Sequence, residues 1–111
     1  MICKQFEVVI VPFPFIDQPG TKSRPAVVLS DQKFNRSGNS ILAMITTTSH
    51  SPWPGDTMIT DRKRAGLTMD CMIRLKLFTL DNKLISRRLG QLGPTDKNQL
   101  VSELQTYMPW I

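Results

Sequence analysis

Short apolar runs separated by turn-forming residues dominate the pattern of hydrophobic and polar positions along this chain. Residues 6–11, 25–30 and 41–46 are rich in β-branched and apolar side chains, which is typical of β-strands. Residues 57–60 fit a fourth, shorter strand. The segments between these runs contain Gly, Pro, Asn and Asp, so we expect turns at 31–40, 62–66 and 81–83.

The segment 69–77 alternates strictly between two sets of side chains. Apolar residues occupy every second position, which predicts one strand face made of Met69, Cys71, Ile73, Leu75 and Leu77. The opposite face would then carry Asp70, Met72, Arg74 and Lys76, and we expect Arg74 and Lys76 to point away from the core. Residues 84–92 form a weaker strand pattern, interrupted by Arg87, Arg88 and Gly90.

A helix is predicted at the C-terminal end of the chain. Leu100, Leu104 and Met108 are spaced four residues apart, as on one face of an amphipathic helix, and Thr95 is placed to cap its N-terminus. Five or six short strands and one helix predict a mainly β fold, namely a small, strongly curved barrel with a C-terminal helix.

Length and composition limit the domain organisation and the partners. The chain has 111 residues, of which 41% are hydrophobic, so we expect residues 1–111 to form a single domain. The net charge of +5 favours polyanionic partners such as nucleic acid or acidic protein segments. Cys3 and Cys71 lack the spacing of a zinc site or a disulfide framework. The longest apolar run, 8–15, is broken by prolines and is too short to span a membrane. We therefore expect a cytoplasmic protein without a metal site or a membrane span.

Polar side chains stand at the ends of two predicted strands. Arg24 precedes the strand 25–30, and its planar guanidinium is suited to phosphate oxygens. The cluster Thr46, Thr47 and Thr48 ends the strand that begins at Ile41. This arrangement predicts a shared site. The same residue types also fit a plainer interpretation, in which Arg24 is an exposed strand-end residue and the threonines only favour β-structure.

Several other residues are candidates for the same site. Thr21 and Ser23 could donate hydroxyl hydrogen bonds, although such residues often serve turn geometry. His50 has a side chain suited to proton transfer, but its loop position also fits a solvated residue. Trp53 could stack on a nucleic-acid base or cover one end of the barrel. The basic residues that could form a groove for a nucleic-acid backbone are Arg62, Lys63, Arg64, Arg74, Lys76, Arg87 and Arg88.

Taken together, five segments resemble the MazF/PemK family of toxins from bacterial type II toxin-antitoxin modules. They are the apolar segment 8–15, the Pro19-Gly20 loop, Ser23-Arg24-Pro25-Ala26-Val27-Val28-Leu29-Ser30, Ile45-Thr46-Thr47-Thr48 and Leu77-Phe78-Thr79-Leu80-Asp81. The resemblance implies an SH3-like barrel of the MazF/PemK/CcdB type that forms a homodimer. It also implies cleavage of single-stranded RNA without a metal or other cofactor, and inhibition by a cognate antitoxin whose disordered tail occupies the RNA groove.

The resemblance also implies roles for individual residues. Arg24 and Thr46 match the family's catalytic arginine and threonine, and the expected reaction is a transesterification that leaves a 2′,3′-cyclic phosphate and a 5′-hydroxyl. An arginine is a poor base, so we expect Arg24 to stabilise charge and protonate the leaving group, and the base stays unassigned. The expected RNA-binding residues are Thr21, Ser23, Thr47, Trp53, Arg74 and Lys76.

Two alternatives to the ribonuclease remain at this stage. Toxins of the CcdB type resemble this family in architecture but trap DNA gyrase through a hydrophobic C-terminal tail, and this chain ends with Met108-Pro109-Trp110-Ile111. Trp110 and Ile111 would otherwise anchor the terminal helix to the barrel. The second alternative is a catalytically inactive module that only binds an antitoxin.

Overall fold

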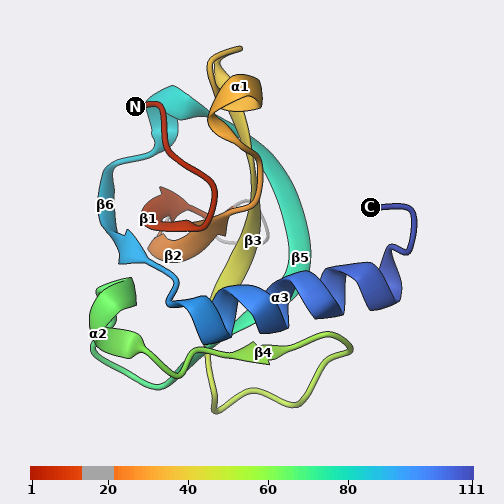
Figure 1. Cartoon of the computed structure of the whole chain (residues 1–111). Coiled ribbons are helices and arrows are strands. Elements are labelled where there is room, and N and C mark those ends of the chain that lie inside the picture. Colours follow the sequence, from red (N-terminus) through yellow and green to blue (C-terminus); the bar gives the residue numbers. More distant parts are fainter. Residues whose placement is uncertain (14–21) are drawn as a thin grey trace.

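Six antiparallel strands form one curved sheet in the computed structural model, which describes residues 1–13 and 22–111. The strand order is β4-β5-β3-β2-β1-β6. The strands are β1 (Glu7–Pro12), β2 (Ser23–Val28), β3 (Asn39–Thr47), β4 (Thr57–Met58), β5 (Cys71–Asp81) and β6 (Arg87–Gln91). Helix α3 (Pro94–Tyr107) lies across one end of the sheet, and the sheet forms a half-barrel (Figure 1). The expected mainly β fold with a C-terminal helix is confirmed.

Three one-turn helices replace segments that the sequence predicted as turns. They are α1 (Gln32–Asn35), α2 (Arg62–Ala65) and the 3₁₀ helix η1 (Asn82–Leu84). Each begins after an aspartate whose side chain accepts a backbone hydrogen bond: Asp31 from Phe34, Asp61 from Arg64 and Asp81 from Lys83. Asp favours both turns and helix N-caps, which is why composition alone did not separate the two.

Both faces of the central strands are buried. Val8, Val27 and Ala43 belong to the core beneath α3, together with Leu100 and Leu104 of that helix. The neighbouring residues on the same strands pack into a second core, which includes Val9, Val11, Ala26, Val28, Leu42 and Phe78. Because the two faces are both covered, β1, β2 and β3 have continuous apolar sequences rather than an alternating pattern.

The alternating pattern of 69–77 is interrupted in the structure. Strand β5 pairs with β3 along its length, but the register shifts between Ala43 and Met44, so Leu75 and Lys76 have no paired residue opposite. Met69 lies before the strand and is exposed, and Met72 is buried although its predicted face was the outer one. Met72 lies between two paired strands, because it stands opposite Thr46 of β3 on one side and Met58 of β4 on the other.

Helix α3 has the predicted apolar face but a different start. Leu100 and Leu104 are buried, as expected from their spacing. Gly93 is the N-cap residue and Pro94 opens the helix, so the expected N-cap Thr95 lies inside the first turn. None of the described helices is long and apolar enough to span a membrane.

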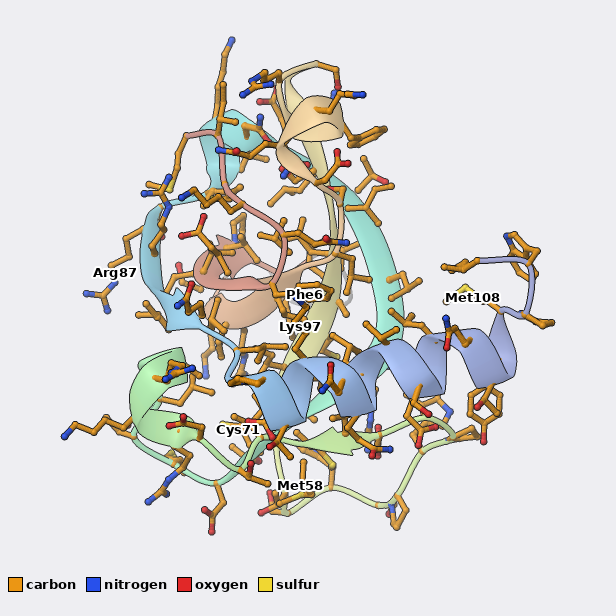
Figure 2. All side chains as sticks on the ribbon, viewed as in Figure 1. Phe6, Met58, Cys71, Arg87, Lys97 and Met108 are labelled. Carbon is orange, nitrogen blue, oxygen red and sulfur yellow. The ribbon has the colours of Figure 1, made fainter. Side chains whose placement is uncertain are left out.

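The first turn of α3 also contacts the N-terminal segment. The Lys97 ammonium lies 5.2 Å from the centre of the Phe6 ring, and the two side chains meet in front of the sheet (Figure 2). Phe6 has a φ of 67°, a left-handed conformation that is uncommon for a bulky residue. Its backbone bonds both neighbouring elements, donating to Val28 and accepting from Leu92, which holds this conformation in place.

Candidate functional site

A pocket of about 210 Å³ lies where the ends of β2, β3 and β5 meet. Its walls contain several of the polar residues that the sequence singled out, among them Arg24, Thr46, Thr47 and Lys76. His50 from the loop after β3 also lines it. The remaining described lining residues are Phe13, Pro25, Met44, Ile45 and Cys71. The structure therefore combines a cationic rim with a largely apolar floor.

The strand register explains why Arg24 and Thr46 share this pocket. Strand β2 pairs with β3 in antiparallel register, with Ala26 opposite Met44. Extending that register by two residues places Arg24 opposite Thr46. Side chains alternate with a period of two, so both residues lie on the same face of the sheet as Ala26 and Met44. The two strand ends that the sequence predicted to lie together thus line one pocket.

The positive charge of Arg24 is available within the pocket. The residue is exposed, and no carboxylate of the described residues pairs with it. Thr46 is 8% exposed, which makes it a buried polar residue at the pocket wall. The hydroxyl of Thr47 lies 2.8 Å from that of Ser49, which ties the end of β3 to the following loop. Within the described part of the chain, the pocket thus offers the Arg24 cation, without a carboxylate partner, beside neutral hydroxyl groups.

Cys71 is a pocket residue that the sequence did not indicate. It stands opposite Thr47 in the β3–β5 pairing, and burial raises the pKa of its thiol above the ordinary value. The thiol therefore stays protonated at neutral pH and contributes an apolar wall. Its place on the core face of 69–77 was predicted correctly, but nothing in the sequence shows that this face reaches the pocket.

Trp53 lies beside the pocket, next to two basic residues of β5. The Lys76 ammonium is 4.8 Å and the Arg74 guanidinium carbon 5.2 Å from the centre of its ring. Arg74 and Lys76 therefore share a face, as the sequence predicted. The indole is 40% exposed, so one part of it is open to solvent while the rest covers these two side chains.

Arg74 lies outside both apolar cores, as expected, but its side chain is not free in solvent. Its side chain is only 12% exposed and forms a salt bridge of 3.0 Å with Asp56. Sequence reasoning missed Asp56, because a single acidic residue in a loop with two prolines and a glycine gives no signal of its distant partner.

The other candidates lie apart from the pocket or outside the described residues. Ser23 is exposed and immediately precedes Arg24, but it is not among the lining residues. Thr21 lies outside the residues that the structure describes. The basic residues of α2 and β6 lie on another side of the sheet, where Arg87 projects away from β6 (Figure 2). Among the described side chains, no group of three or more His, Cys, Asp or Glu is placed to bind a metal ion.

The sequence matches the family model described as PemK-like, MazF-like toxin of type II toxin-antitoxin system, over residues 4–108. This chain therefore belongs to the PemK/MazF-like toxin family. This match confirms the family resemblance that the sequence motifs indicated. Among curated protein sequences, none gives a significant match.

Solved structures with the same fold include toxins from several bacteria. A MazE–MazF complex from Deinococcus radiodurans is 16% identical, with a TM-score of 0.77 and 98% of each chain covered. A mycobacterial endoribonuclease in complex with its cognate antitoxin is also 16% identical, with a TM-score of 0.75, and the match covers 98% of this chain and 97% of that one. A MazF toxin from Mycobacterium tuberculosis is 17% identical, with a TM-score of 0.74 and coverage of 93% and 96%. At these identities the likeness establishes a MazF-like fold.

Proposed function

We propose that this toxin is an endoribonuclease that cuts single-stranded RNA at specific sequences without a metal ion. The observation that carries the proposal is the shared pocket of Arg24 and Thr46, which are the two residues that match the family's catalytic pair. Family membership and the endoribonuclease activity named for a solved relative of the same fold support it.

The proposed reaction is an internal transesterification. The ribose 2′-oxygen attacks the adjacent phosphorus, the bond from phosphorus to the 5′-oxygen breaks, and the products carry a 2′,3′-cyclic phosphate and a 5′-hydroxyl. The 2′-hydroxyl proton leaves to a base, and another proton reaches the departing 5′-oxygen. Arg24 would stabilise the charge on the non-bridging oxygens and protonate the leaving oxygen, and Thr46 would donate a neutral hydrogen bond beside it.

Binding of the RNA would extend from the pocket toward β5. Lys76 and Thr47 line the pocket and would contact the backbone, while Ser23 lies at the start of β2 beside Arg24. The exposed part of Trp53 would stack on a base next to Lys76. We place Thr21 in the same RNA site from the sequence alone.

We further propose that the active form is a homodimer and that a cognate antitoxin inhibits it. Two solved relatives were crystallised with an antitoxin. The net charge of +5 suits an acidic inhibitory segment that competes with RNA. Light scattering of the purified protein, alone and with an acidic protein encoded next to it, would test both statements.

Cleavage of a long mixed-sequence RNA in excess EDTA tests the proposal directly. Specific cuts by wild-type protein, mapped by primer extension, should persist in the chelator and disappear in Arg24→Ala. The variant is the control for contaminating ribonucleases, because it passes through the same purification. The absence of specific cuts by well-folded wild-type protein would reject the proposal and leave the two alternatives, a gyrase poison of the CcdB type and a catalytically inactive antitoxin-binding module.

The exposed C-terminal tail favours one second candidate, a gyrase poison of the CcdB type. Trp110 is 78% and Ile111 63% exposed, so the interpretation that they anchor α3 to the barrel is wrong. After α3 the chain turns back, and its end lies clear of the half-barrel (Figure 1). Inhibition of DNA gyrase supercoiling by wild-type protein, lost on removal of residues 110–111, would support this candidate.

A further inference from the structure

The loop between β3 and β4 is fastened to β5 through one ion pair. Arg74 donates to both carboxylate oxygens of Asp56, from Nε at 3.2 Å and from Nη2 at 3.0 Å. The same Nη2 donates to the carbonyl oxygen of Ser51 at 2.6 Å. Asp56 in turn accepts from the backbone N–H of Trp53 at 2.8 Å. One guanidinium and one carboxylate thus connect three points of this loop to the sheet.

This ion pair differs from the other ion pairs of the described residues in its burial. The Arg74 and Asp56 side chains are 12% and 14% exposed, whereas Arg62 and Asp70 are 45% and 74% exposed. Shielded pairs with two-point geometry are less weakened by solvent than exposed ones, and losing one partner leaves the other charge uncompensated. The arrangement therefore restrains the loop strongly. It also means that the charge of Arg74 is already neutralised before any phosphate arrives.

The restrained loop carries Trp53 to one side of the pocket. Its ring lies within 5.2 Å of Arg74 and 4.8 Å of Lys76, and Lys76 itself lines the pocket. The backbone of Trp53 is fixed by Asp56 and its ring by the two cations, while 40% of the side chain stays exposed. A rigid aromatic surface beside a catalytic pocket is the arrangement that stacking on an unpaired base requires.

We propose that Arg74 and Asp56 are positioning residues, which hold Trp53 as a preformed stacking platform for one RNA base beside the scissile phosphate. This inference rests on the proposed ribonuclease function. It assigns Arg74 a different role from the direct phosphate contact that its charge and strand face predicted.

The test uses full-length protein in a Trp110→Phe background, where Trp53 is the only tryptophan. Acrylamide quenching of Trp53 fluorescence in the RNA-free protein measures how accessible the indole is, and therefore how firmly its position is restrained. We expect Asp56→Asn and Arg74→Gln to increase quenching. With a short RNA that carries a mapped cut site, both should raise KM and leave kcat close to wild type. Trp53→Ala should weaken RNA binding by about 5- to 150-fold, and adding Asp56→Asn to it should change little more.

A direct phosphate contact by Arg74 predicts instead that the two charge variants change RNA binding in opposite directions. In that case Arg74→Gln would weaken binding and lower the slope of log K against log salt by about one, whereas Asp56→Asn would tighten binding by freeing the guanidinium. That result, or unchanged quenching in both variants, would overturn the proposal. Arg74→Lys keeps the charge without the two-point geometry, so it should behave like Arg74→Gln and provides a second variant if glutamine prevents folding.

Glu7→Gln is the matched control. Glu7 pairs with Arg88 at 3.1 Å and is 15% exposed, close to the exposure of Asp56, but it lies on β1 at the β6 side of the sheet. It should leave quenching and KM unchanged. Wild-type protein that binds no RNA would reject this inference and the proposed function together, whereas wild-type cleavage with an unimpaired Asp56→Asn would reject only the positioning role.

Discussion

Arg24 on β2 and Thr46 on β3 line the same pocket, each two residues beyond the pair Ala26 and Met44, where the antiparallel pairing of the two strands ends. One contributes a charge that no carboxylate of the described residues neutralises, and the other a neutral hydroxyl at a buried wall. In the proposed reaction they would act together as a pre-arranged set of donors for an oxyanion. This geometry makes the effects of removing each residue separately measurable.

Replacing Arg24 should abolish most of the RNA cleavage. We expect Arg24→Ala to lower kcat by about 100- to 1000-fold, because a preorganised charged donor is lost. Arg24→Lys keeps the charge but not the planar fork and should recover only a fraction of the rate. Single-turnover cleavage of a mapped RNA substrate measures both variants. A fully active Arg24→Ala would remove this residue from the mechanism.

Thr46→Val tests the hydroxyl without changing the shape of the side chain. The rate should fall by up to about 100-fold, less than for Arg24→Ala, because a neutral donor is removed rather than a charge. Thr46→Ser keeps the hydroxyl and serves as the control. Equal rates for the valine and serine variants would show that Thr46 is present for β-structure alone.

The buried Cys71 thiol should make the protein less stable at alkaline pH. Its pKa is raised by burial above the ordinary value of 9.0, so the folded state keeps the proton that the unfolded chain releases. The stabilising contribution is therefore complete below the unfolded-state pKa and is lost as the pH rises above it. Urea unfolding at neutral and alkaline pH measures the free energy of unfolding. Its decrease from neutral to alkaline pH should be smaller in Cys71→Ala than in the wild-type protein.

Cys3 is the matched control for this experiment. Burial raises the pKa of its thiol as well, but it lies in the second core, away from the pocket. Cys3→Ala should also make the decrease in the free energy of unfolding at alkaline pH smaller. The double variant should make this decrease smaller still. If the double variant lost as much stability at alkaline pH as the wild-type protein, the two buried thiols would not be the cause of that loss.

Asp96 should be one of the main stabilising polar residues. It is 1% exposed and accepts hydrogen bonds from the backbone N–H groups of Thr60 and Asp61 and from the Thr60 hydroxyl. Asp96→Ala leaves these donors without a partner, and we expect the free energy of unfolding to fall by about 2–4 kcal/mol. Urea denaturation measures this, with Asp70→Ala as an exposed control.

Removal of Trp110 and Ile111 should leave folding and RNA cleavage intact. Both residues are largely exposed, so few core contacts are lost and the melting temperature should stay near that of the full chain. Thermal unfolding and the RNA assay check these outcomes. A marked loss of stability would instead indicate that the tail packs against a second subunit.

The sequence was informative wherever a local pattern reports burial or backbone geometry. The β-branched runs predicted β1, β2 and β3, and the spacing of Leu100 and Leu104 predicted α3, because both depend on which residues are apolar along a few turns or pleats. The motif around Arg24 and the cluster at Thr46 indicated the family, which the family model confirmed.

Local patterns failed where the outcome depends on a distant segment. Met72 has an outward-facing position in the alternation but is buried, and it lies between the paired strands β3 and β4. Trp110 and Ile111 are apolar enough to suggest packing, yet they follow the end of α3 and are largely exposed. In both cases the sequence gives the side chain, and its surroundings come from residues elsewhere in the chain.

By itself, the sequence determined the strands, the terminal helix, the positive charge and the family of this protein, since each follows from residues close together in the chain or from a motif. Only the tertiary structure decided which polar residues meet. It placed His50 and Cys71 in the pocket of Arg24, and it paired Arg74 with Asp56. The physical reason is that strand register and loop closure bring together groups far apart in sequence, and the energy of those contacts has no local signature.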